Sequence, residues 1–388
     1  MIVDQAIKAL RSLRRAYRGR RGEFPHDPVS VTLYRGYRSS RKLFVQGRVL
    51  EDAGVRVKAS DRRWRNIVNA VKSFESDEVP GTRVHLDYRG QTFDRVADDE
   101  GYLYVHADVE GEPSPDAWDE IDAEIVDVPL GRRVVERTFV GEVADLSREA
   151  RYAVVTDIDD TLLKTHVTST LKLRALYHTL VDNAHTRVAF EGAAELYRAL
   201  NYGPEGERDD NPVFYLSRSP WNLYGMLESF LDQRDFPRGP VFLRDVGLGY
   251  TAPGSEMGHK ASTLLRLIDD FPELQFVLIG DSGERDADIY LSVAAKHPER
   301  IAAIVIRNVK DNANARRISA LFAAGSSGPG PACYLVRDSA EAAERLAALG
   351  MLNEQQVGQV RASLSAGRER VVREELDGDQ SAAAQVGG

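Results

Sequence analysis

The spacing of hydrophobic residues changes twice along the chain, and the first segment has helical spacing. In residues 1–22, apolar side chains recur at Ile7, Leu10, Leu13 and Tyr17, while Lys and Arg occupy the positions between them. This pattern predicts an N-terminal amphipathic helix with a basic face.

Residues 23–148 have a different pattern, in which short β-prone segments are separated by Gly, Pro and Asp. The segments are "SVTLYRGY", "KLFVQGRV", "RVHLDY", "GYLYVHAD" and "AEIVDV". They predict an all-β, sandwich-like domain. Its one predicted helix is "RWRNIVNAVKSF", residues 63–74.

From about residue 149 to 345, continuous apolar runs alternate with helical segments. The runs are "YAVVTD", "PVFYLS", "GPVFLRD", "QFVLIGDS", "IAAIVIRNV" and "ACYLVRD". Strands without polar alternation are buried on both faces, so the pattern predicts an α/β domain with a Rossmann-like parallel sheet and helices on both faces. A helical insertion at about 162–212 is placed to cover a site. Residues 346–388 are predicted to form a C-terminal helix and a disordered tail.

Composition is that of a globular protein with a sizeable core. The 388 residues are 43% hydrophobic, which suits two or three domains. The single cysteine, Cys333, has no partner for an internal disulfide, so a reducing compartment is expected. No run of ~18 apolar residues occurs. We therefore expect a soluble, cytoplasmic protein, with peripheral membrane contact left open.

Charge is unevenly distributed along the chain. Residues 1–75 hold 18 Lys and Arg against 7 Asp and Glu, although the whole chain has a net charge of −9. The basic segment is either a solvated surface or an anchor for an anionic membrane surface. Nucleic acid is not expected as a partner, because the whole chain is acidic and holds no recognisable binding module.

Polar residues follow the predicted parallel strands where each strand ends. In an open parallel sheet, ligands bind outside these carboxyl ends. Several carboxylates on one rim repel one another unless a cation lies among them. The first four strands end in Asp157 and Asp159, in Ser217, in Arg244 and Asp245, and in Gly280, Asp281 and Asp286.

A calcium-binding EF-hand does not explain the first of these clusters. A loop that starts at Asp157 would place Leu162 where the turn glycine belongs and Thr168 where the bidentate glutamate belongs. The pattern D-x-D-x-T alone is weak, because chance produces it in about a tenth of chains of this length. Its context makes it informative.

Four motifs in sequence order resemble those of the haloacid dehalogenase superfamily. They are "VVTDIDDTLL", "VFYLS" with Ser217, Lys260 of "GHKAS", and "FVLIGDSGERD". The strings "DIDDT", "YLSRSPWNLY", "FLRDVG", "HK" and "GDSGERDADIY" further resemble the catalytic domain of the actin-patch-type phosphatidate phosphatases and their bacterial relatives. This resemblance covers about residues 150–310 and leaves out the β-rich front domain.

The resemblance implies a Mg²⁺-dependent phosphatase. Asp157 would be the nucleophile that forms an aspartyl-phosphate, and Asp159 would protonate the leaving oxygen and later activate water. The implied metal ligands are Asp157, the backbone carbonyl of Asp159, and Asp281. Asp286 would be a further ligand or would orient the others. Thr161 would hold the loop by hydrogen bonding.

The same resemblance implies that Ser217 and Lys260 bind the phosphoryl oxygens. Arg218 would add a contact, although an ion pair with a neighbouring carboxylate is an equal alternative. Ser219 and Pro220 fit the N-cap and first position of a helix, and the N-terminus of such a helix would favour an anion.

The expected function is hydrolysis of phosphatidate to diacylglycerol and phosphate. One alternative is a phosphatase of a soluble phosphomonoester. Another is a lipid- or protein-binding scaffold with vestigial activity. The reaction class is expected from residues and the lipid from resemblance only. A pocket with an apolar wall facing Asp157 would favour the lipid.

Overall fold

The computed structural model describes the chain from residue 28 to residue 369, with gaps. The predicted N-terminal helix, the predicted helix at 63–74, and the residues Asp159 and Thr161 lie outside the described residues. The described ranges are 28–51, 78–114, 116–129, 131–146, 150–158, 184–206, 211–244, 258–283, 285–309, 313–325 and 330–369.

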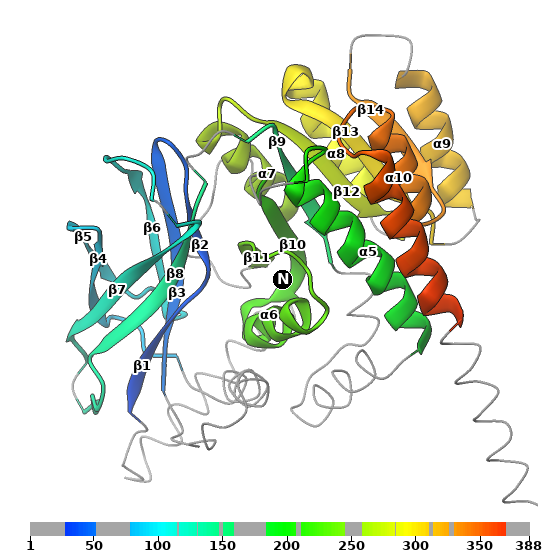
Figure 1. Ribbon diagram of the computed structural model, residues 1–388. Helices are drawn as coiled ribbons and strands as arrows, with labels where there is room; N and C mark the ends of the chain where they lie inside the picture. The colour runs from blue at the N-terminus through cyan, green and yellow to red at the C-terminus, as the bar shows by residue number, and fades with distance from the viewer. Residues whose placement is uncertain are drawn as a thin grey trace, which may run out of the picture.

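The first half of the chain forms an eight-stranded, mostly antiparallel sheet (Figure 1). Its order is β1-β3-β2-β8-β7-β4-β5, and β6 pairs with β3. Alternate residues of these strands share one apolar core, so the predicted all-β region is confirmed. The strands β5 and β8 were not predicted. The bounds are β1 Val29–Leu33, β2 Gly36–Arg38, β3 Lys42–Glu51, β4 Arg83–Tyr88, β5 Gln91–Val96, β6 Tyr102–Asp108, β7 Trp118–Asp127 and β8 Thr138–Asp145.

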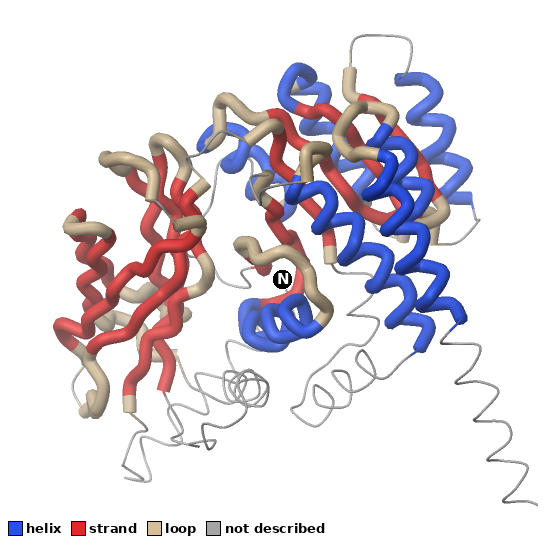
Figure 2. Tube along the Cα trace, in the orientation of Figure 1, coloured by secondary structure: helices blue, strands red, loops and turns tan. Residues whose placement is uncertain are grey.

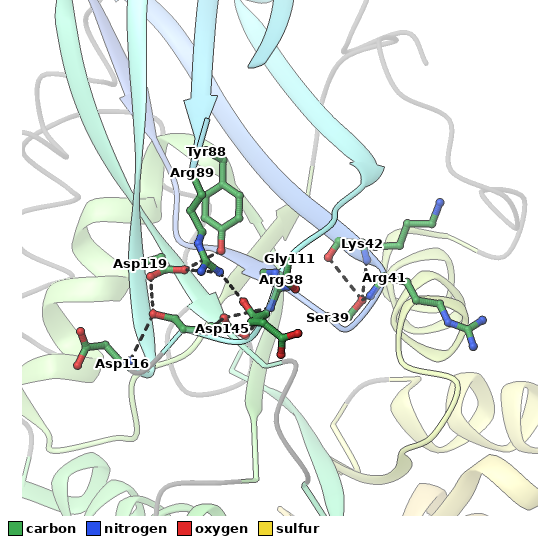
Figure 3. A network of polar contacts seen from close by, with 12 residues as sticks. Arg38, Ser39, Arg41, Lys42, Tyr88, Arg89, Gly111, Asp116, Asp119 and Asp145 are labelled. Carbon is green, nitrogen blue, oxygen red and sulfur yellow. Dashed lines mark hydrogen bonds and ion pairs between the residues drawn. The ribbon is translucent and has the colours of Figure 1, made fainter. Parts of the chain in front are cut away.

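A buried ion pair joins the ends of β2 and β8 (Figure 3). Arg38 Nη1 lies 3.2 Å from both carboxylate oxygens of Asp145, and the two side chains are 1% and 0% exposed. The Asp145 carboxylate also accepts from the Ser114 backbone N–H at 2.6 Å. Because the pair is hydrogen-bonded on several sides, it holds the end of β8, from which the chain continues to the second sheet.

The second half contains a six-stranded sheet in which every pairing is parallel. Its order, β11-β10-β9-β12-β13-β14, places β9 in the middle. The strand order reverses between β9 and β12, which is where open parallel sheets bind ligands. All six predicted runs are confirmed as strands. Their bounds are β9 Tyr152–Asp157, β10 Val213–Pro220, β11 Val241–Arg244, β12 Gln275–Asp281, β13 Ile301–Arg307 and β14 Ala332–Val336.

Helices cover both faces of this sheet, as predicted, and among the described residues they occur only in this half of the chain (Figure 2). One face packs against α5, α6, α10 and the helical residues 354–369, and the other against α7, α8 and α9. The bounds are α5 Ala184–Tyr202, α6 Tyr224–Gln233, α7 His259–Asp270, α8 Asp286–Lys296, α9 Ala313–Gly325 and α10 Ser339–Ala347.

The predicted helix start at Ser219 and Pro220 is wrong. Strand β10 continues through Pro220, which pairs with Arg244 of β11. A short 3₁₀ turn, Trp221–Leu223, then precedes α6. The Ser219 backbone N–H and hydroxyl both bond the Ser217 hydroxyl, so they are engaged within the strand end and Ser219 does not cap a helix.

The two sheets share side chains at their junction. Tyr37 and Phe44 of the β region belong to the core under α7 and α8. The Tyr37 hydroxyl donates to Asp270 Oδ2 at 2.5 Å, and His106 Nε2 lies 2.9 Å from Asp270 Oδ1. Arg35 Nε contacts Glu228 of α6 at 3.1 Å. These contacts pack the β region against the helices that surround the parallel sheet.

Candidate active site

The site is centred on a buried lysine between two aspartates. Lys260, near the start of α7, places its Nζ 2.7 Å from Asp157 Oδ2 and 2.9 Å from Asp286 Oδ1. The three side chains are 2%, 2% and 0% exposed. Asp157 ends the central strand β9, and Asp286 begins α8. The structure therefore brings Asp157 together with two residues that follow it by more than a hundred positions in the sequence.

The end of β12 fits closely around Asp286. Asp286 Oδ2 accepts from the Asp281 backbone N–H at 3.3 Å. A side chain on Gly280 would collide with this carboxylate, because an added β-carbon would lie 2.6 Å from Asp286 Oδ2. Asp281 Oδ1 in turn accepts from the Gly283 backbone N–H at 2.7 Å. Both oxygens of Asp286 are thus engaged by the protein.

Ser217 lies on the strand next to Asp157. Its neighbour Leu216 is the register partner of Asp157 across β9 and β10. The Ser217 hydroxyl donates to Ser219 Oγ at 2.7 Å and is fully buried. The side chain of Arg218, by contrast, is exposed. Ser217 therefore joins the rim that holds Asp157, and Arg218 lies at the surface of the described structure.

A pocket opens beside Asp157 and Asp281, which both line it. Its volume is about 70 Å³. That is roughly half the volume of an apolar cavity that holds one benzene ring. Its wall is largely apolar and comes from β9, β12, β13, β14, α5, α6 and α10. The apolar lining residues are Ile158, Ala193, Leu196, Phe230, Leu231, Phe236, Ile279, Val305, Val336 and Ala342.

Four polar residues of this pocket were not predicted: Tyr197, Arg307, Asp338 and Ser339. The Tyr197 hydroxyl accepts from Thr156 Oγ1 at 2.7 Å, and burial raises its pKa. Arg307 ends β13 and is the register partner of Asp281. The search for polar residues at strand ends would have identified Arg307 if it had been extended to the fifth parallel strand, β13. Nothing in the sequence pattern of α5 distinguishes Tyr197 from a core residue.

The carboxylates at the strand ends are the candidate metal ligands of the described residues. Among the described residues, no group of three or more His, Cys, Asp or Glu side chains is arranged around a common point as metal ligands. Two of the three carboxylates that line the pocket, those of Asp157 and Asp281, stand at the ends of the adjacent strands β9 and β12. The described helices also include none long and apolar enough to cross a membrane.

The part of the chain that contains the parallel sheet and this site matches a known protein family. Residues 152–308 match the family described as "Phosphatidate phosphatase APP1, catalytic domain". Phosphatidate phosphatase APP1 of Saccharomyces cerevisiae is 28% identical over 249 residues, which is 61% of this chain and 40% of the relative. An uncharacterised protein of Schizosaccharomyces pombe is 31% identical over 177 residues, 45% of this chain and 28% of the relative.

The chain thus spans less than half the length of either curated relative. A solved structure, a carbohydrate acetylesterase from Xanthomonas citri, aligns over 72% of this chain and 69% of its own at 9% identity. Its TM-score of 0.22 is too low to support an argument. The family match begins at β9 and ends just after β13, so it contains Asp157, Ser217, Lys260, Asp281 and Asp286. Residues 152–308 of this chain are thus similar to the catalytic domain of the APP1-type phosphatidate phosphatases.

Proposed function

We propose that the protein is a Mg²⁺-dependent phosphatidate phosphatase of the haloacid dehalogenase type. The observation that carries this proposal is the position of Asp157. It ends the central strand, contacts Lys260 at 2.7 Å and faces a pocket with an apolar wall. The parallel sheet with β9 at its centre supports a haloacid dehalogenase-like, Rossmann-like fold.

Asp157 would be the nucleophile. Its contact with Lys260 fixes the direction of the carboxylate, and the ammonium group offsets repulsion between the carboxylate and the anionic phosphoryl group. Asp286 holds Lys260 from the other side, at 2.9 Å. Because both oxygens of Asp286 are engaged, we assign it to orienting Lys260 and the end of β12 and not to direct metal binding.

The reaction would have two steps. In the first, an Asp157 oxygen attacks phosphorus, the bond from phosphorus to the alkoxide oxygen breaks, and the acid form of Asp159 protonates that oxygen. In the second, Asp159 takes a proton from water, whose oxygen attacks phosphorus. The bond to Asp157 then breaks, and orthophosphate leaves with the carboxylate restored. Asp159 lies outside the described residues, as does Thr161, which would steady its loop.

The described donors fit Mg²⁺. Asp157 and Asp281 offer carboxylate oxygens at adjacent strand ends on one pocket, and Mg²⁺ prefers oxygen ligands and keeps several waters. The backbone carbonyl of Asp159 would be the third protein ligand. When bound, the ion would neutralise charge that develops on the phosphoryl oxygens. Ser217, beside Asp157 on β10, would donate to a phosphoryl oxygen.

The apolar wall supports a lipid substrate. A sugar phosphate would expose hydroxyl groups to Leu196, Phe230 and Ile279 without hydrogen-bond partners, which is costly. The pocket volume of about 70 Å³ can hold only the part of a lipid that lies next to the phosphate. We further propose a cytoplasmic protein that contacts an anionic membrane surface peripherally, where this substrate occurs.

The activity is tested with the purified 388-residue chain and p-nitrophenyl phosphate. We expect turnover that needs added Mg²⁺ and disappears with EDTA. Asp157→Asn should lower kcat by at least about 1,000-fold, because it removes the nucleophile. Glu354→Gln, on an exposed helical position, is the matched control and should keep full activity. Turnover that survives Asp157→Asn would overturn the assignment of the nucleophile.

The substrate is tested by comparing phosphatidate in mixed micelles with glycerol 3-phosphate, which has the same phosphate but no acyl chains. We expect kcat/KM to favour phosphatidate by at least about 100-fold, as burial of three or four CH₂ groups would give. Equal or better turnover of glycerol 3-phosphate would contradict the lipid assignment and favour a phosphatase of soluble phosphomonoesters. No turnover of any phosphomonoester would favour the scaffold interpretation.

A further inference from the structure

The pocket beside Asp157 is lined by one guanidinium among three carboxylates. The carboxylates belong to Asp157, Asp281 and Asp338, and the guanidinium to Arg307. Arg307 is the last residue of β13 and lies in register with Asp281 of β12. Its alternate neighbours Ala303 and Val305 face the core under α5 and α10, so Arg307 lies on that face of the sheet.

Protein groups already engage the carboxylates around it. Asp157 contacts Lys260, and Asp281 Oδ1 accepts from the Gly283 backbone N–H. Asp338 caps α10 by accepting from the Glu341 backbone N–H at 3.1 Å, and its other oxygen contacts Arg368 at 3.0 Å. The surroundings of Arg307 are therefore structured without any contribution from its side chain.

The guanidinium of Arg307 differs from these groups. Within the part of the chain that the structure describes, it makes no hydrogen bond and no ion pair, and only the Arg307 backbone carbonyl is engaged, by the Ser282 N–H at 2.9 Å. The side chain is partly buried against an apolar wall. A cation in such a place is costly unless an anion reaches it, and a ligand that enters the pocket can supply that anion.

We propose that Arg307 is a substrate-binding residue that donates to the non-bridging oxygens of the substrate phosphate. A phosphomonoester brings up to two negative charges to a rim that already holds Asp157, Asp281 and Asp286. On this rim, the ammonium group of Lys260 already contacts both Asp157 and Asp286, so its positive charge is shared between two carboxylates. A guanidinium offers paired donors that match a phosphate edge, whereas the neutral ester carbonyls of a lipid would leave its charge uncompensated.

This inference rests on the proposed phosphatase function and is tested separately from the lipid assignment. The wild-type 388-residue chain, Arg307→Gln and Arg307→Lys are compared with p-nitrophenyl phosphate as the substrate, and inorganic phosphate is titrated as a competitive inhibitor. Arg307→Gln should raise both KM and the inhibition constant of phosphate by at least about 10-fold, the loss expected for a charge-assisted hydrogen bond. Arg307→Lys should recover part of this loss, because it keeps the charge but not the paired donors.

Arg317→Gln is the matched control. Arg317 pairs with Asp288 at 2.7 Å on the surface of α8 and α9 and does not line the pocket. It should leave KM and phosphate inhibition within about 2-fold of wild type. Thermal unfolding of each variant shows whether a change in KM comes from lost folding.

Two results would overturn the inference. One is an Arg307→Gln variant whose phosphate inhibition equals that of wild type. The other is a loss confined to phosphatidate, which would move Arg307 to the lipid part of the substrate. If the wild type turns over no phosphomonoester, the proposed function fails. Calorimetric titration with inorganic phosphate then still decides this inference, and equal dissociation constants for wild type and Arg307→Gln reject it.

Discussion

At the scale of single residues, Gly280 shows how closely the site is packed. Its missing side chain leaves room for Asp286, whose Oδ2 would lie 2.6 Å from an added β-carbon. Asp286 must occupy this position to contact Lys260 at 2.9 Å. A glycine that appears in the sequence only as part of "IGDSG" thus allows the lysine between the two aspartates to be held from both sides.

Gly280→Ala should therefore reduce activity by displacing Asp286. We expect kcat on p-nitrophenyl phosphate to fall at least about 10-fold and the free energy of unfolding to fall by about 1–3 kcal/mol, as for an overpacked core. Gly358→Ala is the control, because a β-carbon there meets nothing within 4 Å in a helical segment. It should leave kcat unchanged and raise stability by about 0.5–1 kcal/mol. Full activity of Gly280→Ala would show that the exact position of Asp286 does not matter.

At the scale of elements, the start of α7 carries a titratable group, His259, beside Lys260. Burial lowers the pKa of His259 to about 4 from 6.5, and the nearby cations Arg266 and Lys260 add to the shift. The first turn of a helix also disfavours a positive charge. His259 is therefore neutral in the folded protein at pH 7, and its ring packs as an uncharged group.

Acid should destabilise the protein through this histidine. Between pH 6.5 and 4 the unfolded chain binds a proton that the folded chain does not, so stability is complete above pH 6.5 and is lost as pH falls towards 4. The contribution of His259 is at most about 1.4 kcal/mol per pH unit. Urea unfolding of wild type and His259→Gln across this range measures it. Parallel stability curves for the two proteins would show that His259 does not titrate in this way.

At the scale of the whole molecule, one buried carboxylate connects the two sheets. Asp270, at the end of α7, is 2% exposed and accepts from the Tyr37 hydroxyl of β2 at 2.5 Å. His106 of β6 contacts the same carboxylate. Because α7 also carries Lys260, this junction joins the β region to the helix that positions Lys260.

Tyr37→Phe should weaken the junction. It removes a buried hydrogen bond to a charged group, so we expect the free energy of unfolding to fall by about 1–3 kcal/mol. Tyr202→Phe, on a side chain that is 41% exposed, should change it by less than about 0.5 kcal/mol. Urea denaturation followed by circular dichroism measures both variants. An unchanged stability of Tyr37→Phe would mean that this hydrogen bond does not help to hold the two sheets together.

The sequence by itself determined the strands of the parallel sheet and the candidate site residues at several strand ends. Continuous apolar runs predicted all six parallel strands, because strands buried on both faces need them, and the strand ends identified Asp157, Ser217 and Asp281. The same reasoning missed the strands β5 and β8 and misplaced a helix start at Ser219. Exposed alternate positions weaken the apolar signal of β5 and β8. At Ser219, a hydrogen bond to Ser217 overrides the preference of serine for a helix N-cap.

Only the tertiary structure decided which residues meet. Three features depend on the register of neighbouring strands and on the packing of helices over the strand ends. They are the engagement of both Asp286 oxygens, the exposure of Arg218 and the position of Arg307 in the lining of the pocket. The sequence pattern indicates which strand ends share a rim, but it does not show which side chains contact one another there. The apolar wall beside Asp157 is assembled from seven elements, so no single segment of the sequence predicts it.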